Sequence, residues 1–321
     1  MKDISNIKQN AKKDFQRNHL DNVIDYLRQQ PGCLTEVVAD EENNFKGLFY
    51  QDVHMQNMYA HFPEILLVDA TYKLLDLRMP VYLLMCIDGD GLSEIVAMFI
   101  VAEETNEIIQ ATVELFNKHN KSWDQTKVVM SDKDFTEREV FKVSFPAATL
   151  SICLYHALRS FRREITSEKM GITSAERLRA LEILSSLAHS KTSSEYETHL
   201  DELKHTNITS VIEYVMEGSH PIREQWVACF KEKHLNLGET TTNRLEYMFS
   251  KFKSVYSRYA SLLQFCSEFM SGLLCLREER NHHYVTAITR RQTEFDHVLQ
   301  RSPSVFKESN SVCIQVRSSA I

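Results

Sequence analysis

Three acidic residues have the chemistry and the sequence setting to hold a divalent cation. Asp69 follows the apolar run ILLV and Asp132 follows VVMS, so each stands at the end of a predicted strand. Glu246 falls one turn into a predicted helix that opens with TTTN. A carboxylate at the end of a buried strand costs desolvation energy unless its charge finds a partner. Mg²⁺ and Mn²⁺ prefer such oxygen ligands, and paired cations of this kind align phosphoryl transfer.

Each acid also has an ordinary structural interpretation. An aspartate at a strand end often begins a turn. The spacing Asn243-x-x-Glu246 is that of a helix capping box, so Glu246 could cap a helix, bind a cation, or do both. Asp134-x-x-Glu137 has the same spacing, and we therefore assign Asp134 to helix capping and Asp132 to chemistry. The sequence leaves these alternatives open.

Two further groups of residues could bind a metal or nucleic acid. Cys153 and His156 share a helix face, but two ligands do not complete a structural zinc site, which requires four. We interpret them as a buried cysteine beside a hydrogen-bonded histidine and predict no structural zinc. The basic residues that could contact DNA phosphates, or could form a solvated helix face, are Arg159, Arg162, Arg163, Lys251 and Lys253.

Composition limits the class of protein. The 321 residues include 37 basic and 44 acidic side chains, for a net charge of −7, so any nucleic-acid surface must be local. The seven cysteines include no C-x-x-C pair, which predicts a reducing, intracellular compartment. Met1–Gln30 is polar without a signal pattern, and the longest apolar run, Pro80–Ile87, is too short to span a bilayer. We expect no membrane association.

The elements that must position the acids alternate between strands and helices. Helices are predicted at Asn106–Asn120 and Phe135–Phe145, and the turn DGDG at 88–91 predicts a hairpin. The order predicts an α/β fold whose mixed five-stranded sheet brings the Asp69 and Asp132 strands together. The five predicted strands are Glu64–Thr71, Val81–Asp88, Ser93–Val101, Lys127–Ser131 and Thr149–Leu154.

Four regions are predicted along the chain. Residues 1–62 form a mostly helical N-terminal region with a short strand at Phe45–Tyr50 and a short helix at Met55–Phe62. Residues 63–259 form the sheet domain, interrupted by an all-helical insertion at about 172–238. A C-terminal helix occupies 260–301, and 302–321 is a loose tail. The predicted core of the insertion consists of Leu178, Leu181, Ile183, Leu184, Leu187 and Trp226.

Four motifs in order resemble the transposases of Mutator-like elements (MULEs). Asp69-Ala70-Thr71-Tyr72 resembles their D-A-T-Y signature, and Ser131-Asp132 followed by Cys153-x-x-His156 resembles their second-acid block. Thr241-Thr242-Asn243-Arg244-Leu245-Glu246 is similar to their third-acid block, and Trp226 matches within the insertion. The resemblance covers roughly residues 45–260 and extends to the vertebrate SWIM-zinc-finger proteins that carry a MULE-derived domain.

The resemblance implies an RNase H-like domain of the DDE type, with Asp69, Asp132 and Glu246 as its acidic triad, and a nuclear location. If the triad is active, the resemblance implies DNA strand cleavage and transfer with Mg²⁺ or Mn²⁺, which the presence of all three acids favours. The relatives' C-x-C zinc finger is missing here, and residues 1–62 contain only Cys33.

The missing C-x-C motif, the single cysteine in residues 1–62 and the net acidic charge favour a domesticated factor that binds DNA or protein. A third alternative is a mostly helical interaction protein without a nucleic-acid role, in which the motif match is accidental. The oligomeric state, the protein partners and the DNA target do not follow from the sequence.

Overall fold

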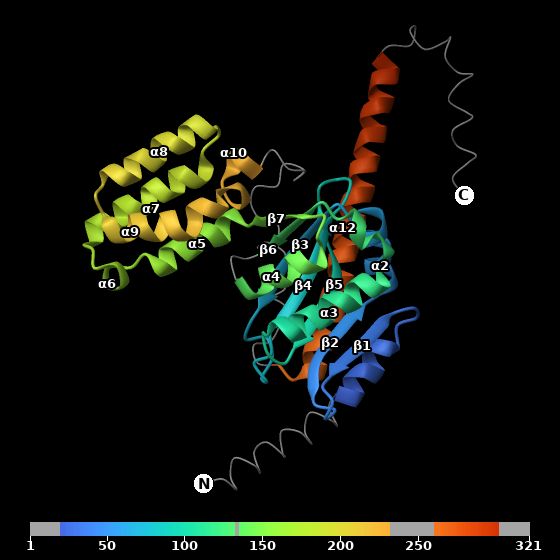
Figure 1. Ribbon diagram of the computed structural model, residues 1–321. Helices are drawn as coiled ribbons and strands as arrows, with labels where there is room; N and C mark the ends of the chain where they lie inside the picture. Colours follow the sequence, from blue (N-terminus) through green and yellow to red (C-terminus); the bar gives the residue numbers. More distant parts are fainter. Residues whose placement is uncertain (1–19, 132–134, 232–259, 302–321) are drawn as a thin grey trace. The chain divides into compact units, whose positions relative to one another are not determined.

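The computed structural model describes residues 20–131, 135–231 and 260–301 (Figure 1). The chain divides into two compact units, Met1–Cys266 and Ser267–Ile321. The first unit contains the sheet and most of the helices, and it therefore contains every described residue of the candidate site.

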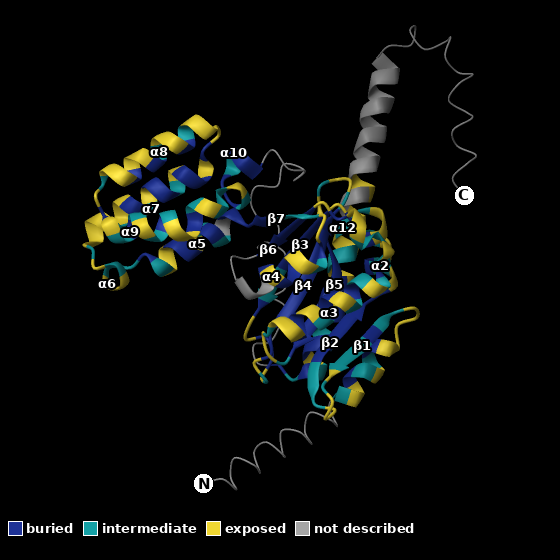
Figure 2. Cartoon of the chain, in the orientation of Figure 1, coloured by how far each residue is buried: buried dark blue, intermediate teal, exposed yellow. Residues whose placement is uncertain are grey.

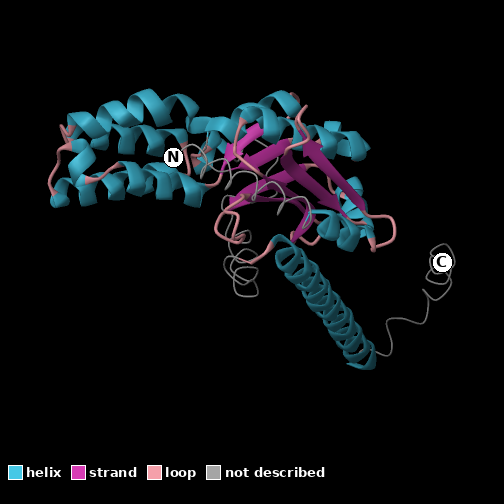
Figure 3. Ribbon diagram, turned by 90° about the horizontal axis from the view of Figure 1, so that it is seen from below, coloured by secondary structure: helices cyan, strands magenta, loops and turns pink. Residues whose placement is uncertain are grey.

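The first unit contains a seven-stranded mixed sheet (Figure 3). Across the sheet the order is β1, β2, β5, β4, β3, β6 and β7. Strand β1 pairs antiparallel with β2, β2 with β5, β5 with β4, and β4 with β3. Strand β6 pairs in parallel with both β3 and β7. The predicted α/β class and the predicted adjacency of the two acid-bearing strands are confirmed. The strands are Leu34–Ala39 (β1), Phe45–Gln51 (β2), Ile65–Thr71 (β3), Val81–Ile87 (β4), Ser93–Val101 (β5), Val128–Ser131 (β6) and Thr149–Ile152 (β7).

The sheet has seven strands rather than the predicted five, because β1 and β2 extend it beyond β5. The sequence predicts β2 but not its place in the sheet, where it pairs antiparallel with β5. The edge strand β1 is not predicted, since only its residue Thr35 is buried and no apolar alternation marks it. Residues 34–51 therefore belong to the sheet, although the sequence analysis assigns residues 1–62 to a mostly helical region.

Helices α3 (Asn106–His119) and α4 (Phe135–Ser144) pack on one face of the sheet. Phe116 of α3 and Phe141 of α4 are fully buried in one cluster with Val68 of β3. Figure 2 shows the central strands as buried and the outward faces of the helices as exposed. Helix α3 connects β5 to β6 as a crossover, and this connection brings β6 in parallel beside β3.

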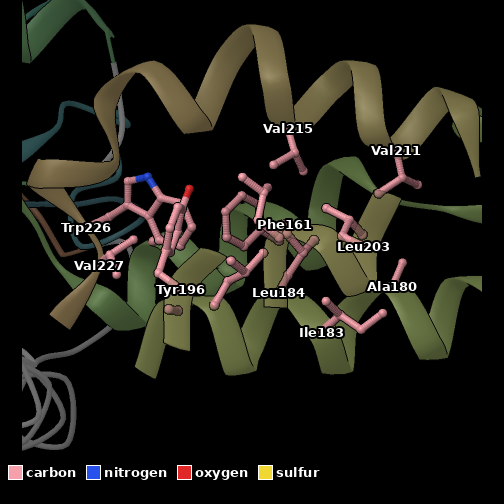
Figure 4. Packing of buried hydrophobic residues seen from close by; sticks show 14 of the residues in the cluster. Phe161, Ala180, Ile183, Leu184, Tyr196, Leu203, Val211, Val215, Trp226 and Val227 are labelled. Atoms are coloured by element: carbon pink, nitrogen blue, oxygen red, sulfur yellow. The ribbon is translucent and has the colours of Figure 1, made fainter. Parts of the chain in front are cut away.

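A group of helices follows β7 and encloses a second apolar core (Figure 4). Trp226 is only 1% exposed, its ring meets Phe161 edge-on with centroids 5.3 Å apart, and its indole Nε1 donates to the Ser219 carbonyl at 2.9 Å. The elements are α5 (Leu154–Glu164), α6 (Ser167–Met170), α7 (Ser174–His189), α8 (Ser193–His205), α9 (Thr209–Tyr214), the π-helical turn η2 (Val215–Ser219), η3 (His220–Gln225) and α10 (Ala228–Lys231).

The described part of the predicted insertion, residues 172–231, contains helices and turns but no strand. Its core includes Ile183, Leu184 and Leu187 as predicted, with Leu181 packed at the margin. The prediction for Leu178 is wrong: its side chain is 60% exposed. Neighbouring apolar residues on α7 supply the buried face, so Leu178 falls on the solvent side of that helix.

Two helices lie outside these groups. Helix α2 (Val53–His61) begins at Asp52, whose carboxylate accepts a hydrogen bond from the Met55 amide at 2.8 Å. Helix α12 (Leu262–Arg301) agrees closely with the helix predicted at 260–301. Among the described residues, no helix combines the length and the apolar character needed to cross a membrane.

Candidate functional site

Asp69 lies near the carboxyl end of β3 and is half-buried. It is the partner of Leu83 in the antiparallel β3–β4 pair. Its neighbours Val68 and Ala70 pack with the core on the α3–α4 face. Because side chains alternate along a strand, the carboxylate of Asp69 belongs to the opposite face of the sheet.

The other two predicted acids, Asp132 and Glu246, lie outside the described residues, as do Asn243, Lys251 and Lys253. Strand β6 ends at Ser131, the residue before Asp132. Within the described part of the chain, no group of three or more His, Cys, Asp or Glu side chains could hold a metal ion. Asp69 is thus the one member of the predicted triad with a described position.

The two ends of the undescribed stretch 232–259 are both anchored near the carboxyl ends of strands. On one side, the Lys231 ammonium donates to the carbonyl of Ile152, the last residue of β7, at 2.8 Å. On the other side, Ala260 bridges to Leu75, in the loop that follows β3. The Ala260 amide donates to the Leu74 carbonyl, and the Ala260 carbonyl accepts from the Asp76 amide, both at 3.0 Å.

Two buried cations lie between the sheet and the helices that follow it. Lys231 is 2% exposed, and burial lowers its pKa to about 8. Arg138, on α4, is 8% exposed; burial lowers its pKa, and its Nη2 donates to the side chain of Gln225 on η3. Sequence reasoning missed both residues, because a charged residue in a polar helical stretch normally predicts exposure.

The three described members of the predicted DNA-binding group lie on α5. Arg159, Arg162 and Arg163 are all exposed. Arg163 forms an ion pair with Glu164 at 2.9 Å, and hydrogen bonds from Lys169 and Arg163 lower the pKa of the Glu164 carboxyl. Arg159 and Arg162 are therefore the exposed arginines on this helix without a described ion pair, and the arrangement fits both a phosphate contact and a solvated face.

The predicted Cys153-x-x-His156 pair lies where the chain passes from β7 into α5. Cys153 is 1% exposed, and its amide donates to the Ser131 carbonyl at the end of β6 at 3.3 Å. His156 is half-buried in the first turn of α5. This backbone link ties the start of α5 to the end of the strand that precedes Asp132.

A carboxylate bridge that the sequence analysis missed lies just after Asp69. The hydroxyl groups of Tyr72 and Tyr82 donate to the same oxygen of Glu104, at 2.6 and 2.7 Å. Glu104 precedes α3, so the bridge holds the segment after β3 against the start of that helix. The side chains of Tyr72 and Glu104 come from positions 32 apart, which no local pattern connects.

One comparison with known families bears on this geometry. Residues 24–151 match the family described as zinc finger SWIM domain-containing protein 1/3, RNaseH-like domain. The matched range includes the sheet from β1 into β7 together with α2, α3 and α4. The sheet and this match contradict the part of the third alternative in which the motif match is accidental. Residues 24–151 are thus similar to the RNase H-like domain of zinc finger SWIM domain-containing proteins 1 and 3.

Proposed function

We propose that this protein is a DNA-binding factor of transposase origin whose RNase H-like domain holds a divalent cation at the carboxyl ends of β3 and β6. The observation that carries the proposal is the parallel pairing of these two strands. In their register Ile65 pairs with Val128 and Leu67 with Met130. Asp69 stands two residues beyond Leu67, and Asp132 two residues beyond Met130. If the pairing continues, both carboxylates fall on the same face of the sheet.

The third acid of the proposed site comes from the stretch 232–259. Its flanking residues Lys231 and Ala260 are held near the ends of β7 and β3. Strands β7 and β3 flank β6, so a segment that begins and ends near them can bring its middle, including Glu246, back to the same edge of the sheet. This arrangement supports a triad of Asp69, Asp132 and Glu246.

The donor atoms fit Mg²⁺ or Mn²⁺. Carboxylate oxygens are the ligands that these hard cations prefer, and the half-buried Asp69 limits competition from bulk water. When bound, such a cation supplies charge stabilisation to phosphate oxygens. The role of Asp69 is to present its carboxylate from a rigid central strand, with the Tyr72–Glu104 bridge holding the segment that follows.

For the present role of the protein we favour DNA binding, with protein partners and a nuclear location, over strand cleavage. The exposed Arg159 and Arg162 offer a local basic surface on a chain whose net charge is −7. The RNase H-like domain family that residues 24–151 match is named for zinc finger proteins rather than for transposases. Mg²⁺-dependent strand cleavage is the second candidate, because all three acids are present in the sequence.

Two measurements on the purified chain separate these functions. First, binding to a duplex DNA should weaken in the double variant R159A/R162A, and the salt dependence of log K should become shallower by roughly two. The control is K204A, which removes an exposed lysine of α8 that pairs with Asp201 at 3.0 Å. Equal DNA binding by both variants and the wild type would contradict the role of α5.

Second, nicking of supercoiled DNA should be tested in Mn²⁺ and Mg²⁺ with D132A as the control. We expect DNA binding without nicking. Nicking that D132A abolishes would instead establish the cleavage function. A chain that neither binds nor nicks DNA would contradict both candidates.

A further inference from the structure

Tyr72 is the one exposed tyrosine, phenylalanine or tryptophan among the residues whose burial the structure describes. Its side chain is 51% exposed and lies in the loop 72–80, which connects β3 to β4. Single exposed apolar side chains are ordinary on protein surfaces. Exposure alone therefore carries no argument, and the surroundings of the ring decide whether Tyr72 has a function.

The Tyr72 ring is held at its far end. Its hydroxyl donates to Oε1 of Glu104 at 2.6 Å, and the hydroxyl of Tyr82 donates to the same oxygen at 2.7 Å. Tyr82 is 1% exposed and is paired with Ala70 in the sheet, so it fixes the Glu104 carboxylate. A ring that is both fixed and accessible loses little conformational entropy when a flat group stacks on it.

The backbone of the same loop adopts an uncommon conformation at two basic residues. Lys73 has a φ of 65° and Arg78 a φ of 56°, in the left-handed region that residues other than glycine usually avoid. Leu74 and Leu75, which follow Lys73, are buried, whereas Lys73 itself is exposed. Such strain persists only where the surrounding structure fixes it, and it is frequent at binding sites.

The loop presents positive charge beside the ring. Lys73 and Arg78 are exposed, and neither forms an ion pair with another described residue. Asp76 is the only acidic residue of the loop, whose net charge is therefore +1. Thr71 pairs with Val81 in the antiparallel ladder, so the two ends of the loop meet at the same end of β3 and β4. The ring and both cations thus belong to one small surface.

We infer that the loop 72–80 binds single-stranded DNA, with a base stacked on the Tyr72 ring and with Lys73 and Arg78 on the flanking phosphates. Every base offers a flat face to an aromatic ring. In a duplex the neighbouring base pairs cover that face, and unstacking it costs energy. The inference rests on the proposed DNA binding. It adds the class of strand and a second contact surface besides Arg159 and Arg162.

The test is the affinity for a labelled oligothymidine of roughly 20 nucleotides, longer than a typical single-strand site, measured by fluorescence anisotropy. Y72A should weaken binding about five- to a hundredfold, as the loss of a stacking aromatic ring does. Y72F keeps the ring and loses the bond to Glu104, so its affinity should lie between those of the wild type and Y72A. K73Q/R78Q should make the salt dependence of log K shallower by roughly 1.4.

Two controls separate stacking from a general effect on the fold. L178A removes another exposed apolar side chain, on α7, and should leave the affinity unchanged. An abasic oligonucleotide of the same length keeps the phosphates but has no base, so Y72A and the wild type should bind it equally. Equal binding of oligothymidine by Y72A and the wild type would overturn the inference. The same loss of affinity by Y72A for both oligonucleotides would also overturn it.

Failure of this inference and failure of the proposed function give different results. Duplex binding that R159A/R162A weakens, together with oligothymidine binding that Y72A leaves intact, keeps the proposed function and removes this inference. A wild type that binds neither form of DNA removes both. Should Y72A fail to fold, the wild type alone decides, because it should bind oligothymidine more tightly than the abasic oligonucleotide. Equal affinity for the two would contradict base stacking.

Discussion

Arg138 and Lys231 are the buried basic residues of the described chain, at 8% and 2% exposure. Each contacts a polar group at the junction of the sheet and the helical region. Removal of a charge from water is costly, so the buried Lys231 makes the stability of the native state depend on pH. Asp69, by contrast, was predictable as a strand-end acid, because four apolar residues precede it.

Lys231 gives a prediction with a definite sign. Burial lowers its pKa from 10.5 to about 8, so the folded state binds this proton less tightly than the unfolded state. The cost of burial is fully present below about pH 8 and is relieved as the pH rises towards 10.5. Between about pH 7 and about pH 9.5, the wild type should gain about 2 kcal/mol relative to K231M.

Urea unfolding at the two pH values measures this difference. The variant matters because other groups titrate at high pH: burial raises the pKa of Tyr196 and of Cys266 to about 12. Tyr196 and Cys266 are present in both the wild type and K231M, so their contributions to the pH dependence of stability cancel when the two proteins are compared. A difference that is constant with pH would mean that Lys231 keeps an ordinary pKa in the folded protein.

Trp226 shows, at the scale of elements, how the helical region is held together. It packs against Phe161 of α5, and its indole satisfies the Ser219 carbonyl at the end of the π-helical turn. The side chain therefore joins α5, η2 and η3. With 1% exposure it belongs to the core and is not available to stack on a nucleic-acid base.

Substitutions at Trp226 should separate packing from hydrogen bonding. W226A should lower the free energy of unfolding by about 3–5 kcal/mol through the cavity that it leaves. W226F keeps most of the ring and loses the bond to Ser219, so its cost should be about 1–2 kcal/mol. L178A, on the exposed side of α7, should change stability by less than about 0.5 kcal/mol. Similar unfolding midpoints for W226A and L178A would contradict this account of the core.

Among the elements, the five strands β3 to β7 agree with the predicted ranges to within one or two residues. Each is a compact apolar run bounded by turn residues, which is a strong local signal. The edge strand β1 has no such signal, because one of its faces is partly exposed and its sequence LTEVVA mixes polar and apolar residues. Its pairing with β2 is therefore known only from the fold.

At the scale of the whole molecule, the sequence predicts the fold class and the neighbouring acid-bearing strands but not the contacts between distant segments. The Arg138–Gln225 contact joins positions 87 apart, and the Tyr72–Glu104 bridge joins positions 32 apart. Such pairs depend on how the elements dock, and local periodicity contains no information about docking. The convergence of Asp132 and Glu246 on Asp69 remains a prediction of the same kind, since two of the three residues lie outside the described chain.

The most direct test of the central claim is the melting temperature of the purified chain as Mg²⁺ or Mn²⁺ is added. Converging carboxylates repel one another unless a cation compensates, and a ligand that binds only the folded state stabilises it. At a cation concentration of about 100 times Kd, the gain should be about 2.7 kcal/mol. We predict that the wild type melts at a higher temperature in either cation and that D69N and E246Q abolish the increase. An unchanged melting temperature in the wild type, or an equal increase in D69N, would contradict a cation site built on Asp69.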